Sequence, residues 1–354
     1  MKKSFLALAA LATVGLASAQ SSVTVFGAVD LNLQHASGSA GSRNQMTTSG
    51  LDGSKIGVRG SKDLGGGLAA SFHLEADVSP DSGVGGGTNT NNQASGNVNG
   101  GGLMFNRRAT VSLSGSWGEV RLGRDYGPQI RSLGMFDPFF FQGAGSSLLA
   151  IQHVFSPAGI RASNSIGYLY NTQGFGNGQG FYTELKYWLG ENASNVAAPV
   201  GKNDGTGYGA RFGFANGPFD VALALSNTQY ATGNVKLNNI GGGWDFGVAR
   251  ALFQYSRNSV AGVDGRGYQI GAIAPVGAGM VRASYSQYKT NAALSPTTDK
   301  WQLGYVYNLS ESTALYATHS HSSNNAGANF SYFTGLTSFG SSASATEFGV
   351  KHSF

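Results

Sequence analysis

The charged side chains of this chain are few, and those that could act together are mostly basic. Asp, Glu, Lys and Arg make up 12% of the residues, about half their share in an ordinary soluble domain. The candidate site residues are Lys55, Arg59, Arg108, Arg124, Arg161 and Arg282, with Asp137 as the acid closest to them. A group of cations with a single acid beside it has a net positive charge, so it attracts anions in water and repels cations. Because they are far apart in the sequence, a fold must bring them together.

We find no catalytic or metal-binding constellation in the sequence. His319 and His321 stand two residues apart and could bind a metal, but no Asp, Glu or Cys is near them, so we interpret them as exposed polar residues. The glycine runs at 65–67 and 241–243 lack the lysine and helix of a phosphate-binding loop. A serine with an oriented histidine, or paired acids beside a histidine, is also missing. We therefore predict no enzyme activity and no cofactor.

Alternation of apolar and polar residues identifies the elements that must position these side chains. Between Val23 and Gln34 the odd positions are apolar, apart from one glycine, and the even positions are mostly polar or small. In the stretch 68–78 one face carries His73, Glu75 and Asp77, which the core of a soluble protein would not accept. Each such strand therefore has one apolar face and one hydrated face.

The lengths of the connections decide between a soluble sandwich and a membrane barrel. Tight turns alternate with long polar or glycine-rich stretches at 35–53, 79–102, 191–206, 229–237, 257–265, 290–298 and 322–342. Short turns at one end and long loops at the other are typical of an outer-membrane barrel, whereas a sandwich has short turns at both ends. We therefore predict an all-β fold, a 16-stranded antiparallel transmembrane β-barrel with short periplasmic turns and long external loops.

The strand count is even, as bacterial barrels require. The predicted strands begin near Ser22, Ser54, Leu68, Phe105, Glu119, Asn164, Phe181, Gly207, Phe219, Asn239, Val248, Gly267, Met280, Lys300, Thr313 and Thr346. Such a barrel encloses more room than side chains can fill, so its lumen should hold water. By parity Lys55, Arg59, Arg108 and Arg282 point into it. Arg124 has outward parity and needs a bulge or a strand end to reach the lumen.

A segment of 37 residues, Gly127 to Ser163, interrupts the strands. It is far longer than an ordinary connection, and it is too apolar to be disordered because it contains Met135, Phe136 and the run 139–141. These side chains need a place to bury, and the interior of the barrel offers one. We therefore predict that this third external loop folds inward and narrows the channel, with Asp137 facing the basic wall.

The first nineteen residues have the pattern of a secretory signal peptide. Lys2 and Lys3 precede an apolar stretch at 5–16, and Ala17, Ser18 and Ala19 form a small-residue cleavage site. We predict a signal peptide at 1–19 and one barrel domain at 20–354. Removal of the signal peptide lowers the formal charge from +5 to +3. This net charge is too small to indicate a nucleic-acid-binding protein. The chain has no cysteine, so a hydrogen-bonded sheet must stabilise the exported protein without disulfides.

Several blocks of sequence carry a resemblance to a known family. They are SSVTVFGAVD, SKIGVRGSKDLGGGLAASFHLEAD, FNRRATVSLSGSWGEVRLGRDYGP, FDPF in the long segment, and the terminal GVKHSF. Together they resemble the general trimeric porins of β-proteobacteria, Gram-negative outer-membrane proteins of the Neisseria, Burkholderia and Comamonas type. The likeness covers the whole mature chain, and GSKDLGGGL and the NRRA block are its most specific parts.

The resemblance implies a homotrimer of sixteen-stranded barrels in the cell outer membrane, with the third loop as the constriction. It supports Lys55 and Arg124 as pore-wall cations opposite an acidic loop. The implied partners are outer-membrane lipid, lipopolysaccharide and the assembly machinery, which recognises a last strand ending on an aromatic such as Phe354. The chain also has its own sign of a trimer. Outward aromatic residues recur from the sixth strand onward and are rare in the first five, so we expect the first five strands to form the subunit contact.

The predicted function is passive diffusion of small hydrophilic solutes and ions through a water-filled pore. Because inward cations outnumber the acids that we can place, we expect mild anion selectivity. The alternative is a substrate-selective porin in which Phe139, Phe140 and Phe141 form an apolar slide for one nutrient. A barrel enzyme, or an adhesin that acts through its external loops, is a more distant possibility.

Overall fold

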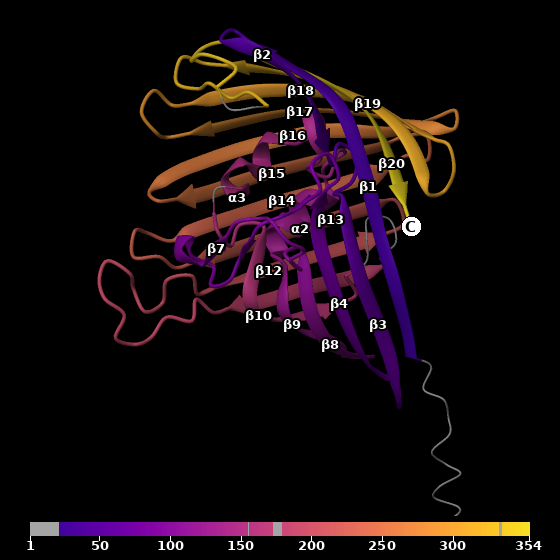
Figure 1. The fold of residues 1–354 in the computed structure, drawn as a ribbon, viewed down its shortest axis with the longest axis vertical. Helices are drawn as coiled ribbons and strands as arrows, with labels where there is room; N and C mark the ends of the chain where they lie inside the picture. The colour runs from indigo at the N-terminus through magenta and orange to yellow at the C-terminus, as the bar shows by residue number, and fades with distance from the viewer. Residues whose placement is uncertain (1–20, 155, 173–178, 333–334) are drawn as a thin grey trace, which may run out of the picture.

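Sixteen antiparallel strands close into a barrel in the computed structural model, which describes residues 21–154, 156–172, 179–332 and 335–354 (Figure 1). The barrel strands are β1 Ser21–Gly38, β3 Lys55–Gly65, β4 Leu68–Ser79, β8 Arg108–Gly115, β9 Gly118–Tyr126, β10 Arg161–Tyr170, β11 Gly180–Trp188, β12 Gly207–Asn216, β13 Phe219–Thr228, β14 Val235–Asp245, β15 Arg250–Val260, β16 Val263–Val276, β17 Gly279–Thr290, β18 Thr297–Asn308, β19 Thr313–Asn324 and β20 Ala343–Ser353. The sheet closes because β1 pairs with β3 on one side and with β20 on the other. The predicted fold class is confirmed, while the signal peptide predicted for 1–19 lies outside the described residues.

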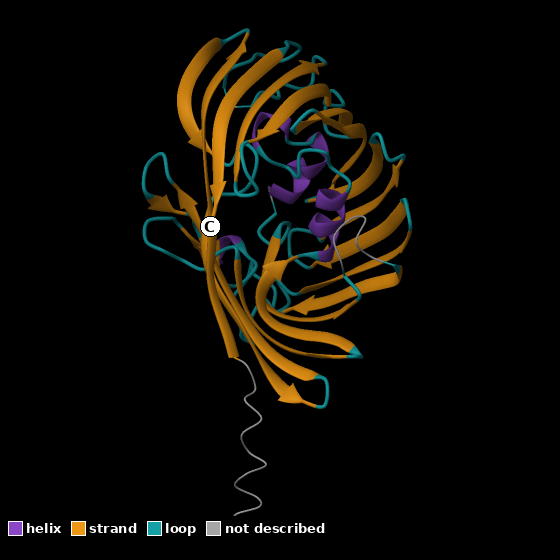
Figure 2. Cartoon of the chain, turned by 90° about the vertical axis from the view of Figure 1, so that its right-hand side faces the viewer, coloured by secondary structure: helices purple, strands orange, loops and turns teal. Residues whose placement is uncertain are grey.

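The remaining elements belong to the connections. They are β2 Gly41–Thr48, β5 Val84–Gly85, β6 Thr88–Asn89, η2 Ala94–Gly96, β7 Asn97–Val98, α2 Pro128–Met135, η3 Gly143–Gly145, η4 Leu148–Ala150 and α3 Ile151–Val154. Helical segments lie inside the ring of strands (Figure 2). Within the described ranges, no helix has both the length and the apolar character needed to cross a membrane.

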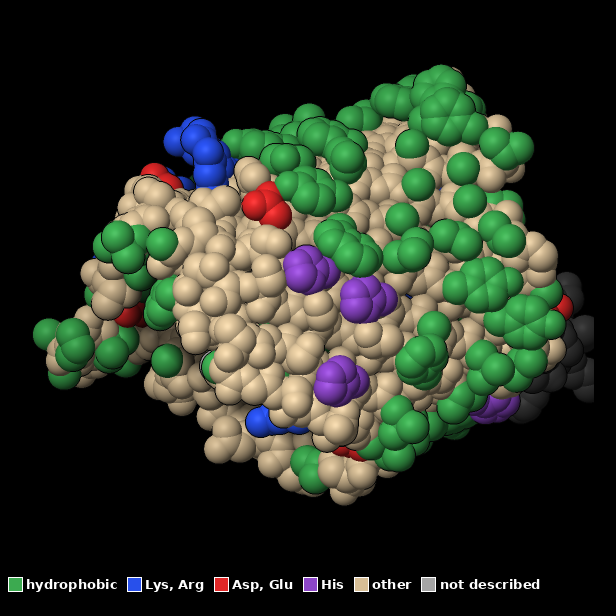
Figure 3. Space-filling model, turned by 90° about the horizontal axis from the view of Figure 1, so that it is seen from above, with side chains coloured by type: hydrophobic (Ala, Val, Ile, Leu, Met, Phe, Trp, Pro, Cys, Tyr) green, Lys and Arg blue, Asp and Glu red, His purple; other side chains and the backbone are tan. Residues whose placement is uncertain are grey.

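The two faces of the strands differ as the alternation predicts. Leu33, Leu185 and Leu303 are exposed by 62%, 41% and 51%, while their strand neighbours Glu184 and Gln302 are buried on the inner face. Apolar side chains gather over one part of the wall and give way to a polar surface toward one end (Figure 3). An apolar outer band is what lipid requires, because every exposed apolar group there avoids water.

Two predicted loops are extensions of strands. The segment 35–53 contains the hairpin of β1 and β2, in which His35 pairs with Asn44, and the segment 257–265 contains the ends of β15 and β16. In the second hairpin Val260 pairs with Val263 around a two-residue turn, whose residues Ala261 and Gly262 both have positive φ, as a type I′ turn requires. Beyond the membrane neither face needs to be apolar, so the alternation that marks a strand disappears.

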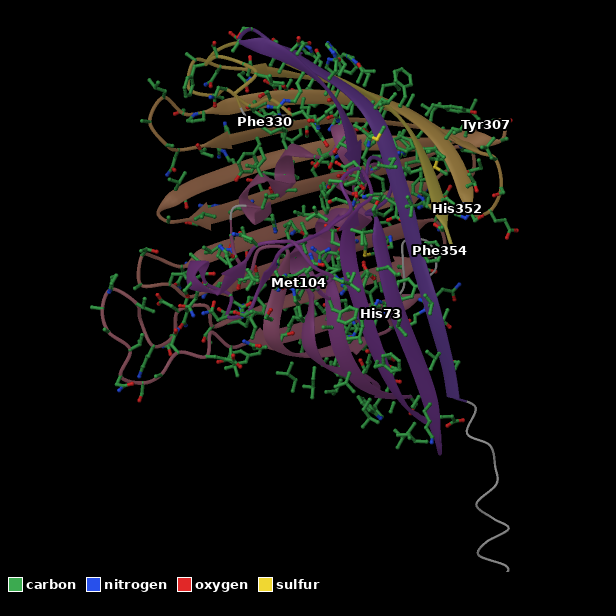
Figure 4. All side chains as sticks on the ribbon, viewed as in Figure 1. His73, Met104, Tyr307, Phe330, His352 and Phe354 are labelled. Atoms are coloured by element: carbon green, nitrogen blue, oxygen red, sulfur yellow. The ribbon has the colours of Figure 1, made fainter. Side chains whose placement is uncertain are left out.

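The end of the chain docks on the first strand. Gly27 N donates to Phe354 O over 2.9 Å, and Phe354 N donates back to Gly27 O over 3.1 Å. A Cβ at Gly27 would lie 2.4 Å from the Phe354 ring, so only glycine admits this contact. Figure 4 shows Phe354 and His352 beside β1 near the end of the barrel where Tyr307 lies, with Phe330 at the opposite end.

Charge on the two faces of one strand should have unequal consequences. Arginine in place of Leu185, which points outward from β11, should destabilise the folded barrel by about 2 to 4 kcal/mol near mid-membrane. Arginine in place of Ser71, which points inward from β4, should cost little because it faces water. Urea titration of protein refolded into vesicles measures both free energies, and equal losses would contradict the assignment of the faces.

Candidate functional site: a narrowed lumen with a basic wall

The third external loop runs through the interior of the barrel. Asn239 of β14 donates its side-chain amide to Gln129 O over 2.9 Å. Further along, Lys300 Nζ of β18 donates to Ser146 O over 2.6 Å, and Ala144 N donates to Glu347 of β20 over 3.0 Å. The loop therefore contacts inner-face residues on widely separated strands. It narrows the lumen across its width, and side chains of the wall hold it by hydrogen bonds to its backbone.

Glycines in the wall make room for the large side chains of this loop. A Cβ at Gly241 would lie 2.4 Å from the ring of Phe136, and a Cβ at Gly271 would lie 2.5 Å from Pro138. Phe136 packs in the first of these sockets against Tyr182 and other inner-face residues. Because a methyl group would displace the ring, these two inward glycines fix where the loop can dock.

Asp137 organises the turn at the centre of the loop. Its carboxylate accepts hydrogen bonds from Phe139 N at 3.0 Å, Phe141 N at 3.1 Å and the side chain of Gln269 at 3.0 Å. Burial raises the pKa of Asp137, although these three donors favour the charged form. The turn places the side chains of Phe139 and Phe140 in different environments. Phe139 is 1% exposed against the wall, while Phe140 has a positive φ and is 53% exposed.

A cluster of five cations and three acids lines the part of the wall that lies across the lumen from β16, the strand that contacts Asp137. We call it the Asp125–Glu184 cluster. The Asp125 carboxylate forms ion pairs with three guanidinium groups, with N···O distances of 2.6 Å to Arg121, 3.3 Å to Arg131 and 3.9 Å to Arg108. The other ion pairs of the cluster are Arg131 to Glu184 at 3.0 Å, Arg211 to Glu184 at 3.8 Å, Lys186 to Glu184 at 3.9 Å and Arg121 to Glu119 at 2.8 Å. Strands β8, β9, β11 and β12 and helix α2 all contribute to it.

The Asp125–Glu184 cluster is positive and partly open to water. Arg131 and Arg108 keep 27% and 23% of their side chains exposed, whereas Asp125 and Glu184 are buried. Burial opposes the charged form of Arg131, but Glu184 and Asp125 together raise the pKa of this guanidinium above its ordinary value. Arg131 therefore stays charged. Because the acids lie beneath the cations, the charge presented to the lumen is mainly positive.

The structure spreads the residues predicted from sequence over several places. Arg108 belongs to the Asp125–Glu184 cluster. Lys55 lies 2.7 Å from Asp52, and Arg59 stacks over the ring of Phe26 at 4.9 Å. Arg282 is 4% exposed, and its guanidinium lies 4.9 Å from the centre of the Phe139 ring. Arg282 and Phe139 thus hold the loop against the barrel wall through a buried contact. Lys55 and Arg59 remain partly exposed to solvent.

Arg124 and Arg161 lie together, apart from the others. Both line a mostly polar cavity of about 310 Å³ between the second external loop and the end of the third. Arg124 donates to the backbone of Asn106 at 2.7 Å and of Asn89 at 3.1 Å. A bulge where β9 meets β10 accompanies this placement, because the register shifts between Ala162 and Ser165. Arg124 thus binds an external loop.

Among the lumen cations that form ion pairs with acids, sequence reasoning missed four. Arg121 and Lys186 share inward parity with Glu119 and Glu184, so alternation alone could have found them. Arg131 lies in a loop helix, where strand parity gives no information. The fourth, Arg107, precedes β8 and binds Glu75 at 2.5 Å. Its position depends on where that strand begins.

A buried histidine, His153, stabilises the end of the inward loop. Protonation of His153 should destabilise this part of the loop. His153 is fully buried, its Nδ1–H donates to Gly159 O over 3.1 Å, and burial lowers the pKa of His153 to about 4. The ordinary pKa is about 6.5, so the released loop binds more protons between these values. The loop is held fully above about pH 6.5 and should lose up to about 3 kcal/mol as pH falls toward 4.

Protease sensitivity of the loop at pH 7 and pH 5 measures this loss. The control is His153→Asn, which keeps an amide donor for Gly159 but cannot titrate. Cleavage of the native protein should increase on acidification, and that of the variant should not. Identical pH dependence in both would show that another group controls the loop.

Comparisons with known proteins agree with this architecture. The family model described as Gram-negative porin matches residues 6–327. The chain is 36% identical to outer membrane porin protein 32 of Delftia acidovorans, with all of both chains covered. The anion-selective porin from Comamonas acidovorans has a TM-score of 0.80 and 33% identity, and covers 95% of this chain and 100% of its own.

More distant structures share the fold alone. The trimer form of OmpT from Vibrio cholerae has a TM-score of 0.65 at 13% identity, with 94% of this chain and 99% of its own covered. The predictions of a pore-forming outer-membrane barrel and of its family are confirmed by the family match and by the relatives. A closed barrel of sixteen strands, a lumen narrowed by its third loop and a match over most of the sequence have one explanation, which is that this chain belongs to the Gram-negative porin family.

Proposed function

We propose that this porin is a general diffusion pore with a mild preference for anions. The observation that carries the proposal is the Asp125–Glu184 cluster, in which five cations face three acids beside the narrowed lumen. Small hydrophilic solutes and ions would cross down their gradients, and anions would be enriched at the cluster. The similar Comamonas acidovorans protein is named an anion-selective porin, which supports the same conclusion.

The residues that we propose to line the pore fall into two groups. Lys55, Arg59, Arg108 and Arg131 would act on ions directly, since their side chains keep some contact with solvent. A second group would set the width of the pore by holding the loop: Asp137, Phe139 and Arg282. Arg124 and Arg161 would act further out, at the cavity between the second and third loops.

The assembly that we propose is a homotrimer made through the outer faces of β1, β3, β4, β8 and β9. Their exposed apolar residues are mainly aliphatic, such as Val25, Leu33, Val111 and Leu122. Aromatic side chains, which mark a lipid interface, are more frequent on later strands, for example Tyr187, Phe212 and Trp301. OmpT, which shares the fold, is described in a trimer form.

The proposed biogenesis begins with cleavage of the signal peptide 1–19. The assembly machinery would then recognise β20 with its terminal Phe354, and the finished barrel would lie among lipid and lipopolysaccharide in the outer membrane. The docking of Phe354 on β1 supports this role, because the last strand closes the barrel on the first.

Planar-bilayer recording with the purified protein tests the proposal. Conductance steps that are ohmic and arrive in groups of three would support a trimer of open pores. Reversal potentials across a KCl gradient should have the sign of anion preference and shrink as salt rises, because screening acts within about 8 Å at physiological ionic strength. Cation preference, or current blocked by one solute class alone, would contradict a general anion-preferring pore.

A further inference from the structure

Two histidines, His319 and His321, lie on the outer face of β19. They are two residues apart, so both side chains leave the same face of the strand. The register of β18 and β19 places His319 opposite Leu303 and His321 opposite Trp301, two side chains that are exposed on the outside of the barrel. Histidine side chains gather where the apolar part of the wall meets the polar part (Figure 3). We call His319 and His321 the outer histidine pair, and both keep partial contact with solvent.

Both imidazole rings of the outer histidine pair are held from two sides. On one side, the centre of the Trp301 ring lies 5.3 Å from that of His319 and 6.1 Å from that of His321. On the other side, β20 provides a hydroxyl group for each Nδ1 atom. Thr346 Oγ1 lies 2.7 Å from Nδ1 of His319, and Ser344 Oγ lies 2.9 Å from Nδ1 of His321. The same arrangement therefore orients both rings.

These contacts leave the Nε2 atoms of the pair available to a ligand. When the proton is on Nδ1, each ring donates to its hydroxyl group, and Nε2 keeps a lone pair. Within the described residues, Nε2 of His319 has no hydrogen-bond partner, and Nε2 of His321 has only the Ser323 hydroxyl at 3.5 Å, the limit of a hydrogen bond. Histidines that bind metal ions usually donate their other ring nitrogen to a polar group in this way.

The spacing of the pair suits two ligands of one ion. Residues two apart on a strand have Cα atoms about 7 Å apart. Two nitrogens bound to one ion at about 2.1 Å lie about 3 to 4 Å apart, which the rings reach by inclining toward each other. His35 also points outward, but it lies two strands from His319 and bonds Asn44 on its far side over 2.6 Å. Among the described residues no three His, Cys, Asp or Glu side chains are grouped to hold a metal ion, so the pair supplies two ligands and water supplies the others.

We propose that the outer histidine pair binds a divalent transition-metal ion on the outer surface of the barrel, with Cu²⁺ preferred over Ni²⁺ and Zn²⁺. Imidazole nitrogen suits these three ions, whereas Mg²⁺ and Ca²⁺ take oxygen ligands. For a given set of ligands, Cu²⁺ binds most tightly of the divalent ions in this series. The sequence alone favours exposed polar residues at these positions, because the orienting hydroxyl groups come from another strand. The site is separate from the lumen and does not depend on the ion preference of the pore.

Isothermal titration calorimetry of the untagged full-length protein in detergent tests the proposal, with Cu²⁺ as the probe. The wild type should bind one ion per chain at this site. Replacement of one ligand, His319→Asn or His321→Asn, should weaken Cu²⁺ binding by about tenfold or more, and the double variant should lose the site. Cu²⁺ should also quench the fluorescence of Trp301, and Trp301→Phe should remove this quenching while the heat of binding remains. Titration with Mg²⁺ should give no heat.

The matched control is His352→Asn. His352 is an exposed histidine whose Nδ1 lies 2.9 Å from a hydroxyl group, Thr313 Oγ1, but no second histidine stands two residues away. This variant should bind Cu²⁺ as the wild type does. A second test keeps both imidazoles and removes their orienting hydroxyl groups, by Ser344→Ala and Thr346→Val. It should weaken Cu²⁺ binding by about tenfold, an effect that two merely exposed histidines would not produce.

Equal Cu²⁺ affinity in the wild type and the double histidine variant overturns the proposal, and so does an equal loss of affinity in the His352 control. Heat-modifiable migration on gels shows whether each variant has folded. Electron paramagnetic resonance of the Cu²⁺-loaded wild type requires no variant, so it decides the question if the double variant does not fold. The spectrum should show coupling to two imidazole nitrogens, and coupling to one nitrogen or to none also overturns the proposal.

Discussion

Replacement of both Arg108 and Arg131 by Gln should abolish most of the anion preference of the pore. These are the two cations of the Asp125–Glu184 cluster with the largest exposed fractions. After their removal, Arg121, Lys186 and Arg211 still balance Asp125, Glu184 and Glu119, so no buried acid is left alone. A unit charge about 4 Å from an ion in water contributes about 1 kcal/mol, which corresponds to about a fivefold change in local concentration.

Reversal potentials across a KCl gradient measure this change, and the effect should be largest at low salt. The control is the double replacement of Arg124 and Arg161 by Gln, which removes the same charge from the cavity between the external loops. It should shift the potential less. If the control shifts the potential as much as the test variant does, the outer cavity determines selectivity and the cluster does not.

Deletion of residues 139–145 should raise the single-channel conductance severalfold while the barrel still folds. This segment contains Phe139 and extends to Gly145, whose carbonyl accepts a bond from Gln302 on the far wall. A barrel of sixteen strands leaves an open aqueous channel when nothing crosses it. Heat-modifiable migration on gels should show that the sheet is intact, because strand pairing does not involve the loop.

A gentler variant tests the same constriction without shortening the chain. Gly241→Val fills the socket that holds Phe136, so the start of the loop should leave the wall. Gly242→Val serves as a control, since a Cβ there would meet its nearest atom at 3.1 Å and lies on the opposite face. Raised and noisier conductance is expected for the first variant alone. Unchanged current in both the deletion and the Gly241 variant would mean that another segment sets the width.

The fold could be predicted because its signals are local. Alternation along each strand marks the two faces wherever lipid lies on one side and water on the other, as between Leu185 and Glu184. The signal ends where the environment becomes the same on both faces, and the hairpin around Asn44 was therefore predicted as a loop. Strand existence thus follows from sequence more reliably than strand length.

The site could be predicted only in part, because it depends on long-range contacts. Parity placed Arg108 on the inner face, but nothing in the sequence shows that Arg131 of the loop helix lies 3.0 Å from Glu184. The apolar character of Phe139 led to the prediction that it lines the pore. In the structure, the turn organised by Asp137 directs the Phe139 side chain against the barrel wall, where it is buried. The roles of these residues in conduction remain predictions.

The inward loop carries one cation and one acid, Arg131 and Asp137, between Gly127 and Ile160, and His153 is neutral at pH 7 because burial lowers its pKa to about 4. Its net charge is therefore zero. A voltage of 100 mV does about 2.3 kcal/mol of work on each elementary charge that crosses the whole field. When the loop moves as a rigid body by translation along the field, the work done on the two charges cancels, so an applied potential exerts almost no net force on it. We therefore expect the open current to stay linear with voltage over the range in which the wall contacts hold.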